Sequence, residues 1–395
     1  MNEVRSYPFS APRALELDPT YAYVREHEPL CRIRLPYGED AWLVTRFDDV
    51  RTVLSDQRFS RAAALGRDVP RSTPVSPSFG ILDMDPPEHS RLRRLLAKAF
   101  TARRVEELRP RTQQIADEML DAFVENGPPG DLANDFALPL SVTVICELLG
   151  VPYDDRDRFE QWTEALLAMT ALTTQQRTEY IGHLSAYMAG LVEQRRRRST
   201  DDLLGALVLA RDEQDRLSED ELMFLAVGLL AAGHETTANQ ISNFVYVLLD
   251  HPEQQALLRG NPDLIPAAVE ELSRFVPLTA GPTLPRYATA DLELSGGTVR
   301  AGEPVLASRS AANRDPRVFA DPDGLDLTRT PGLNFGFGHG VHHCLGAPLA
   351  KMELQVALGT VLDRFPALDL AVDRTQLRWK SGMALRGPTA FPLTW

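Results

Sequence analysis

One long helix constrains the fold of this chain more than any other feature. Residues 218–221 (Ser-Glu-Asp-Glu) form a capping box, in which the Ser and Glu side chains satisfy free backbone N–H groups where a helix starts. Pro252 supplies the stop signal, because the residue before a proline avoids helical geometry. The helix predicted over 218–250 is roughly 50 Å long, enough to cross a domain. Its middle, Leu229 to Ala232, is apolar on every side, so we expect it to be buried.

Helical periodicity also dominates the rest of the 395 residues. It predicts further helices at about 14–27, 47–56, 87–125 (broken near Thr101), 135–149, 154–170, 174–198, 262–276 and 345–364. Short β-branched and aromatic runs predict strands at about 30–35, 41–45, 283–294, 298–308 and 376–393. The fold class is therefore mainly α with a minor β region.

Composition limits the compartment and the partners. The three cysteines, Cys31, Cys146 and Cys344, cannot form a disulfide scaffold, so we expect a reducing cytoplasm. Residues 1–20 contain no long apolar run, so we expect neither a signal peptide nor a membrane anchor. The net charge of −13 argues against nucleic acid as a partner.

A glycine-rich loop leads into Cys344, and the predicted helix at 345–364 follows it. Gly338, Gly340 and Gly346 allow the backbone to bend closely around the sulfur. The helix N-terminus presents free N–H groups and a partial positive charge, which favour thiolate over thiol. Such a thiolate suits single-point ligation of a large metal cofactor. The alternatives are a small buried cysteine, the usual fate of a free one, and a zinc site, which lacks a second nearby cysteine.

The long helix carries a second unusual stretch. Gly233 inside a buried helix costs about 1 kcal/mol relative to alanine. Glu235 and Thr236 place an acid and an alcohol at the same depth. Close approach of a flat ligand and of a diatomic molecule would compensate. The alternative is that Thr236 hydrogen-bonds a carbonyl four residues earlier and only bends the helix.

Two weaker motifs lie on other predicted helices. Glu271 and Arg274 have E-x-x-R spacing, so they share a helix face and can pair. His89 and Arg93 are four residues apart in a helix opened by Pro86-Pro87, so they also point the same way. By themselves these patterns are equally typical of solvated helix faces.

With Phe337, Gly340, Cys344 and Gly346 at this spacing, together with the other motifs, the chain resembles the cytochrome P450 family of haem–thiolate monooxygenases. The resemblance implies a single domain over residues 1–395, shaped as a triangular prism. It implies haem b between the long central helix and the helix that follows the cysteine loop. A small β-rich lobe is expected mainly at 28–60, 283–308 and 368–395, with an α-rich lobe formed by the remainder.

The resemblance also implies roles for individual residues. Cys344 would be the axial ligand of the haem iron, Glu235 would relay protons, and Thr236 would hydrogen-bond the oxygen and its water. The Glu271–Arg274 pair would be buried and structural. Further haem contacts would come from His89, Arg93, Arg286 and His342 to the propionates, and from Ala232, Gly233, Phe337, Gly338 and Gly346. The substrate pocket would include Leu229, Leu278, Leu284, Met383 and Leu385, for which ordinary core packing is the alternative.

A family member of this kind is a cytoplasmic monomer that binds no nucleic acid and no membrane. It takes two electrons from ferredoxin and ferredoxin reductase and hydroxylates or epoxidises a largely apolar small molecule, here a secondary metabolite such as a polyketide or peptide intermediate. A basic patch of Arg91, Arg94, Arg103, Arg104 and Lys351 would dock the donor, unless these arginines pair with acids such as Glu106 and Glu107.

Three other functions fit the same resemblance. A sterol or terpenoid hydroxylase would use the same chemistry on another substrate. A peroxide-dependent haem enzyme and a non-catalytic haem-binding protein are also possible on this fold. The intact Glu235-Thr236 pair argues against these last two.

Overall fold

The computed structural model describes residues 4–74, 80–212, 216–282 and 284–395. They form two compact units, one of Met1–Arg91 with Ala267–Cys344 and one of Leu92–Pro266 with Leu345–Trp395. Helices dominate and the strands are short, so the predicted mainly α fold with a minor β region is confirmed.

The first unit is built on a six-stranded sheet of order β1-β2-β3-β9-β6-β4. β3 and β9 run parallel, with Trp42 opposite Val305, although they are far apart in sequence. The sheet strands are β1 Arg5–Ser6, β2 Leu30–Arg34, β3 Ala41–Val44, β4 Phe59–Ser60, β6 Arg286–Ala288 and β9 Pro304–Ala307, and β7 Leu292–Leu294 pairs with β8 Gly297–Val299. The helices of this unit are α1 Thr20–His27, α2 Phe47–Ser55 and α12 Arg309–Ala312.

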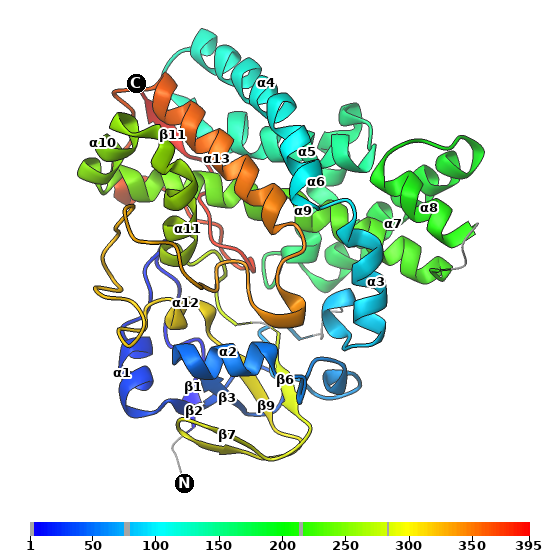
Figure 1. Cartoon of the computed structure of the whole chain (residues 1–395), viewed down its shortest axis with the longest axis vertical. Helices are drawn as coiled ribbons and strands as arrows, with labels where there is room; N and C mark the ends of the chain where they lie inside the picture. The colour runs from blue at the N-terminus through cyan, green and yellow to red at the C-terminus, as the bar shows by residue number, and fades with distance from the viewer. Residues whose placement is uncertain (1–3, 75–79, 213–215, 283) are drawn as a thin grey trace. The chain divides into compact units, whose positions relative to one another are not determined.

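Residues of this sheet alternate between two hydrophobic clusters. Leu30 packs in one cluster, with Phe47 and Val50 of α2, so α2 covers that face of the sheet (Figure 1). Cys31, the next residue of β2, packs in the other cluster. Burial raises the pKa of the Cys31 thiol to about 11, as expected of a structural rather than reactive cysteine.

The second unit is mainly helical. Its helices are α4 Ala102–Asn126, α5 Leu138–Leu149, α6 Arg156–Leu167, α7 Thr174–Arg197, α8 Leu203–Asp212, α9 Glu219–Leu249, α10 Pro252–Gly260 and α13 Ala347–Arg364. α4 and α13 lie side by side (Figure 1). A three-stranded antiparallel sheet joins β5 Gly130–Asp131, β10 Asp369–Leu370 and β11 Pro392–Thr394. Two of the three unit boundaries fall within α3 Glu88–Ala97 and α11 Ile265–Phe275, and the third falls between Cys344 and Leu345.

The long helix α9 forms as predicted, and both halves of its capping box are made. Leu230 and Ala231 are buried, but Leu229 is half-buried and Ala232 is exposed. The prediction that this stretch is buried on every side is therefore wrong. The uncovered positions Leu229, Ala232, Gly233 and Thr236 follow helical spacing, so they form one open stripe in the middle of α9.

Several element boundaries differ from the prediction. The helix expected from residue 14 begins at Thr20, just after Pro19. α8 was not predicted. The strand expected at 376–393 is limited to β11 and an isolated bridge between Trp379 and Pro388. Thr283, the first residue of another expected strand, lies outside the described residues.

Among the described residues, one helical stretch is long and apolar enough to cross a membrane by composition alone. It is Leu132–Leu149, and 61% of it is buried inside the fold. Core helices of globular proteins pass the same test, so this stretch is weak evidence for a membrane span.

Candidate functional site

The cysteine loop is closed by its own backbone. The N–H of Cys344 donates to the carbonyl of Phe337 at 2.9 Å, and the Cys344 side chain is exposed. Gly338 and Gly340 have φ values of +77° and +70°, which favour glycine. A Cβ on Gly340 would also collide with the carbonyl oxygen of Leu54. The glycines therefore have structural reasons to be there, and the loop holds the sulfur at a fixed place.

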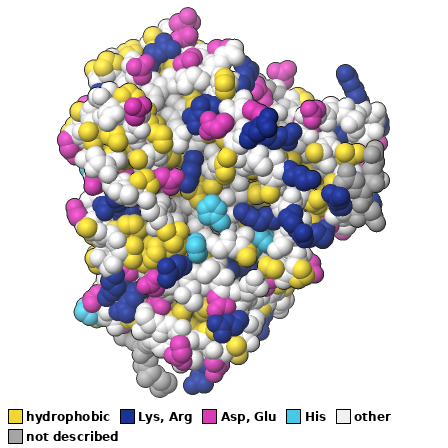
Figure 2. All heavy atoms as spheres, viewed as in Figure 1, with side chains coloured by type: hydrophobic (Ala, Val, Ile, Leu, Met, Phe, Trp, Pro, Cys, Tyr) yellow, Lys and Arg dark blue, Asp and Glu magenta, His cyan; other side chains and the backbone are white. Residues whose placement is uncertain are grey.

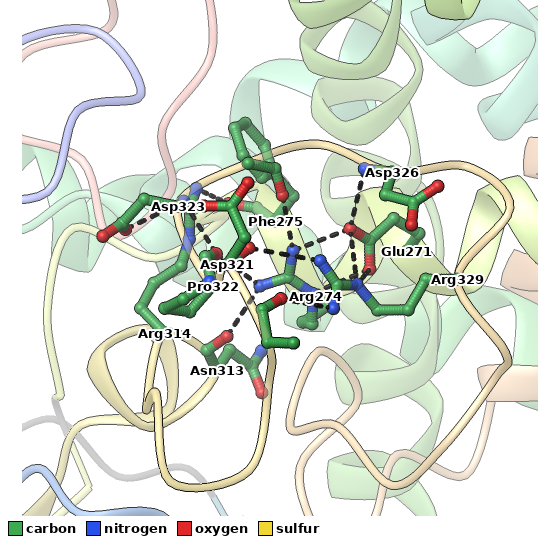
Figure 3. Close-up of polar contacts among 12 residues, drawn as sticks. Glu271, Arg274, Phe275, Asn313, Arg314, Asp321, Pro322, Asp323, Asp326 and Arg329 are labelled. Atoms are coloured by element: carbon green, nitrogen blue, oxygen red, sulfur yellow. Dashed lines mark hydrogen bonds and ion pairs between the residues drawn. The ribbon is translucent and has the colours of Figure 1, made fainter.

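The E-x-x-R motif forms a buried ion pair on α11 (Figure 3). Arg274 Nη2 lies 2.7 Å from Glu271 Oε1, and each side chain is only 2% exposed. The same guanidinium donates to the carbonyls of Asn313, Pro322 and Gly324 at 2.9, 2.7 and 3.1 Å. Its charge is therefore shared between one carboxylate and three carbonyls.

This network continues into the start of the cysteine loop. Asn313, whose carbonyl accepts from Arg274, also accepts at its side-chain oxygen from the N–H of Phe335 at 2.7 Å. A Cβ on Gly336 would lie 2.6 Å from the carbonyl oxygen of Ser273 on α11. The Glu271–Arg274 pair thus supports the cysteine loop through Asn313.

A cluster of basic side chains is buried in the first unit, the one that contains Cys344. His89 and Arg286 are 2% and 6% exposed, and the rings of His89 and His342 lie 4.4 Å apart. Burial, with the positive charges of Arg286, His89 and Arg61, lowers the pKa of His342 to about 3. Burial and Arg61 likewise lower the pKa of Arg286 to about 10, against the opposing effect of Asp85. An anion at this cluster would stabilise the charged forms.

Two residues near these groups were missed by the sequence reasoning. Arg61 is 4% exposed and pairs with Asp83 at 2.6 Å, and it acts on both His342 and Arg286. Arg309 Nη1 lies 3.9 Å from where a Cβ on Gly338 would be. Burial lowers the pKa of Arg309, and the nearby Cys344 sulfur offsets only part of this shift. Neither residue belongs to a motif that the sequence alone could reveal.

In the second unit, the open stripe of α9 carries Thr236. Its hydroxyl donates to the carbonyl of Ala232 at 3.0 Å, so the back-bonding alternative is realised. Thr236 is nevertheless half-buried and on the open stripe, whereas Thr237 is 3% exposed and faces the core. The register therefore favours Thr236 over its neighbour for contact with a ligand.

Gly233 and His234 are explained by packing within the second unit. A Cβ on Gly233 would lie 2.5 Å from Ile145 Cδ1, so a side chain there would force Ile145 of α5 to shift. His234 is fully buried, with Nδ1 at 2.8 Å from the carbonyl of Leu230 and Nε2 at 3.1 Å from Thr163 Oγ1. Burial lowers the pKa of His234, and both ring nitrogens are occupied. His234 is therefore a structural histidine and not a metal ligand.

Glu235 is buried but paired. Lys380 Nζ donates to Glu235 Oε2 at 3.1 Å, and Asn239 Nδ2 donates to the same oxygen at 2.9 Å. Burial acts to raise the pKa of Glu235, but Lys380 and the other partners outweigh it, so the pKa is lowered. Lys380 was not anticipated from the sequence.

The remaining predicted residues are less distinctive. Met383 and Leu385 are 7% and 6% exposed, whereas Leu278 and Leu284 are half-buried. Gly346 caps α13 with an ordinary φ of −81°. Arg93 is half-buried on α3, on the same helix face as His89.

Basic side chains gather over α3, the helix of Arg91 and Arg94 (Figure 2). On α4, Arg103 pairs with Glu107 at 3.1 Å. This agrees with the alternative that arginines of the basic patch pair with nearby acids. The pair is exposed, with 90% of the Arg103 side chain accessible, so its charges are largely screened by water.

Comparison with known proteins identifies the family. The family model described as cytochrome P450 matches residues 19–390. This chain belongs to the cytochrome P450 family. The mycinamicin IV hydroxylase/epoxidase of Micromonospora griseorubida is 55% identical over 393 residues, which span 100% of this P450 and 99% of the relative. The nocardicin C N-oxygenase of Nocardia uniformis subsp. tsuyamanensis is 53% identical over 395 residues, spanning 100% and 99%.

Solved structures agree with these relatives. The crystal structure of HinD with NMFT and NO has a TM-score of 0.97 and 51% identity, with 100% of both chains covered. The LnmA hydroxylase from the leinamycin pathway of Streptomyces atroolivaceus has a TM-score of 0.93 and 52% identity, with 99% of this P450 and 100% of that chain covered. The predicted P450 monooxygenase is therefore confirmed.

The P450 family uses haem, and the residues of this chain fit it. Both ring nitrogens of His342 are buried without a hydrogen-bond partner, beside the desolvated guanidinium of Arg286. Such donors suit the propionate carboxylates of haem. An exposed cysteine in a loop closed by its backbone suits a thiolate ligand, and the open stripe of α9 suits the flat surface of a macrocycle.

Proposed function

We propose that this P450 hydroxylates or epoxidises a largely apolar secondary metabolite, such as a polyketide or peptide intermediate. The observation that carries the catalytic part is on α9, where Thr236 lies on the open stripe and the adjacent Glu235 is buried and ion-paired. The substrate class is supported by two relatives of more than 50% identity, which are named for mycinamicin IV and nocardicin C.

The residue roles follow from the family resemblance and from the chemistry of each group. Haem, when bound, would supply an iron that activates dioxygen, and a thiolate ligand would favour O–O cleavage. Cys344 would provide that thiolate, and Arg309 would add a compensating positive charge. The propionates would be held by His89, Arg93, Arg286 and His342, and the macrocycle would be bordered by Ala232, Gly233, Phe337, Gly338 and Gly346.

Proton delivery would use two side chains of α9. Glu235 is held ionised by Lys380, and its carboxylate would accept a proton from solvent when that ion pair opens and then release it again. The Thr236 hydroxyl donates to Ala232, which leaves its lone pairs free to accept from a water or an acid. Leu229, Leu278, Leu284, Met383 and Leu385 would exclude water and orient the apolar substrate.

Partners and compartment are proposed on the same basis. Ferredoxin and ferredoxin reductase would supply the two electrons, with docking at Arg91, Arg94, Arg103, Arg104 and Lys351. A positive patch on a chain of net charge −13 would steer an acidic donor. We further propose that the two units form one P450 domain and that the protein is a cytoplasmic monomer.

A reconstituted assay tests this function. The holoenzyme, a ferredoxin and its reductase are mixed with a panel of macrolides, peptides, sterols and terpenoids, and substrate binding is followed by the haem spin state. Oxygen uptake that matches hydroxylated or epoxidised product supports the proposal. Turnover of sterols or terpenoids alone would overturn the substrate class. Product formed only with added peroxide would identify a peroxide-dependent enzyme, and absence of turnover with every bound ligand would indicate a non-catalytic haem protein.

A further inference from the structure

The partner of Glu235 comes from a loop far along the chain. Lys380 lies at the start of residues 379–388, which we call the 379–388 loop. Its two arms are joined by the Trp379–Pro388 bridge and by the N–H of Lys380, which donates to the carbonyl of Gly387 at 2.9 Å. Lys380 is one of only three lysines in the sequence. Its ammonium is a compact charge on a flexible stem, so a small movement of the loop changes its distance from an acceptor.

The second arm of the 379–388 loop also contacts α9. The carbonyl of Arg386 accepts from Asn243 Nδ2 at 3.0 Å. A Cβ on Gly387 would collide with the side-chain oxygen of Asn239, the same residue that donates to Glu235. Both arms therefore contact the stretch of α9 from Glu235 to Asn243.

The tip of the 379–388 loop is fixed to a different segment, residues 167–171, which follow the end of α6. The carbonyl of Gly382 accepts from the N–H groups of Met169, Thr170 and Ala171 at 2.7, 2.8 and 3.2 Å. The N–H of Ala384 donates to the carbonyl of Leu167 at 2.9 Å. These backbone contacts couple any displacement of the 167–171 segment to the loop.

We propose that Lys380 is a positioning residue that couples the 167–171 segment to the protonation of Glu235. While the tip is held, the ammonium stays at Oε2 and the carboxyl stays ionised despite its burial. When the segment moves away, the ion pair opens, burial then dominates, and Glu235 takes one proton from solvent. Glu235 is thus protonated when the 167–171 segment is displaced, for example by a substrate that enters the pocket.

Besides burial, the titratable groups that act most on the pKa of Glu235 are Lys380, from the loop, and His234, from α9 itself. His234 is tied to Leu230 and, through Thr163, to α6, so it stays in place while Lys380 moves. The inference rests on the proposed proton-relay role of Glu235, but the coupling can be measured without turnover.

Infrared difference spectroscopy of the holoenzyme over a pH series tests the coupling. The carbonyl stretch of the protonated Glu235 carboxyl is assigned by its loss in Glu235→Gln. We expect Lys380→Met to raise the pH midpoint of this band by roughly 1–3 units, and Lys380→Arg to restore it. An unchanged midpoint in Lys380→Met would overturn the proposal, and thermal unfolding of each variant checks that the fold is retained.

A distant variant separates coupling from a purely local effect. Gly382 has φ +71°, and a Cβ there would lie 2.7 Å from the N of Ala171, so Gly382→Ala should loosen the tip and leave the ion-pair residues in place. Hydrogen exchange of residues 167–171 reports the loosening. If Gly382→Ala does not speed this exchange, Ala384→Pro is used instead, because it removes the N–H that donates to the carbonyl of Leu167. Faster exchange with a raised Glu235 midpoint supports the proposal, whereas faster exchange with an unchanged midpoint refutes it. Normal coupling of electrons to product in Glu235→Gln would instead refute the relay role alone.

Discussion

Arg274 and Glu271 form an ion pair in which each side chain is 2% exposed. Removing one partner of a buried pair typically costs about 3–5 kcal/mol, and because Glu271 keeps a second partner in Arg329 at 3.2 Å, the lower end of about 3 kcal/mol applies here. We expect Arg274→Met to destabilise the protein by about this amount and to loosen the cysteine loop through Asn313. Chemical unfolding of the holoenzyme measures the loss. Arg103→Met removes the exposed partner of Glu107 and is the matched control, for which we expect less than about 1 kcal/mol; equal effects would contradict the structural role.

Cys344→Ala should abolish the thiolate-type spectrum of the reduced carbon monoxide complex. The sulfur is the group that would define this spectrum, and alanine offers no ligand. Cys146→Ala, which alters a buried cysteine of α5, should leave the spectrum intact. A surviving thiolate-type spectrum in Cys344→Ala would show that the haem ligand lies elsewhere.

Thr236→Ala should uncouple electron consumption from product formation and release hydrogen peroxide. The hydroxyl lies on the open stripe of α9, and its removal would delete the group proposed to orient water and protons. Peroxide per electron pair is measured beside product. Thr237→Ala is the control, because Thr237 is 3% exposed and faces the core. If only the Thr237 variant became uncoupled, the proton-handling role would belong to Thr237.

Arg286→Met should accelerate haem loss by about tenfold or more, because a charge-assisted hydrogen bond is worth about 1.5–3 kcal/mol. Transfer of haem to apomyoglobin measures the rate. Arg58→Met removes an exposed arginine paired with Asp56 and should leave the rate nearly unchanged. Similar rates in both variants would exclude Arg286 from propionate binding.

Glu353 on α13 predicts a pH dependence of stability. It is 1% exposed, its Oε2 has no hydrogen-bond partner, and burial raises its pKa well above the usual value. The unfolded chain ionises this group above about pH 4.3, whereas the folded chain keeps its proton. Its contribution to stability therefore falls as the pH rises, by about 1.4 kcal/mol per unit, until the folded pKa is reached.

Glu353→Gln removes this titration and keeps the shape of the side chain. We expect its urea midpoint, relative to that of the unaltered protein, to rise progressively from pH 5 to pH 8. A difference that stays constant, or that favours Glu353 at high pH, would mean that the carboxyl is ionised and paired in the folded protein.

The sequence predicted the features that local rules govern. The capping box and Pro252 located α9 to within a residue at each end, and E-x-x-R spacing located the pair on α11. Contacts between distant segments were not predictable. Lys380 is 145 residues from Glu235, and Arg309 reaches the cysteine loop from a four-residue helix. The packing reason for Gly233 was not predictable either. Ile145 of α5 occupies the space beside it, and no local sequence pattern could reveal this contact.

The backbone closure of the cysteine loop bears on how this enzyme can be re-engineered. The position of Cys344 is determined by main-chain hydrogen bonds, by glycines that accept no Cβ and by the buried Arg274 network, all within one unit. Three of the five candidate substrate-facing side chains, Leu229, Met383 and Leu385, belong to the other unit and to none of these contacts. Directed evolution of substrate scope can therefore begin with these three side chains, and libraries that spare residues 335–344 should retain haem incorporation in most of their members.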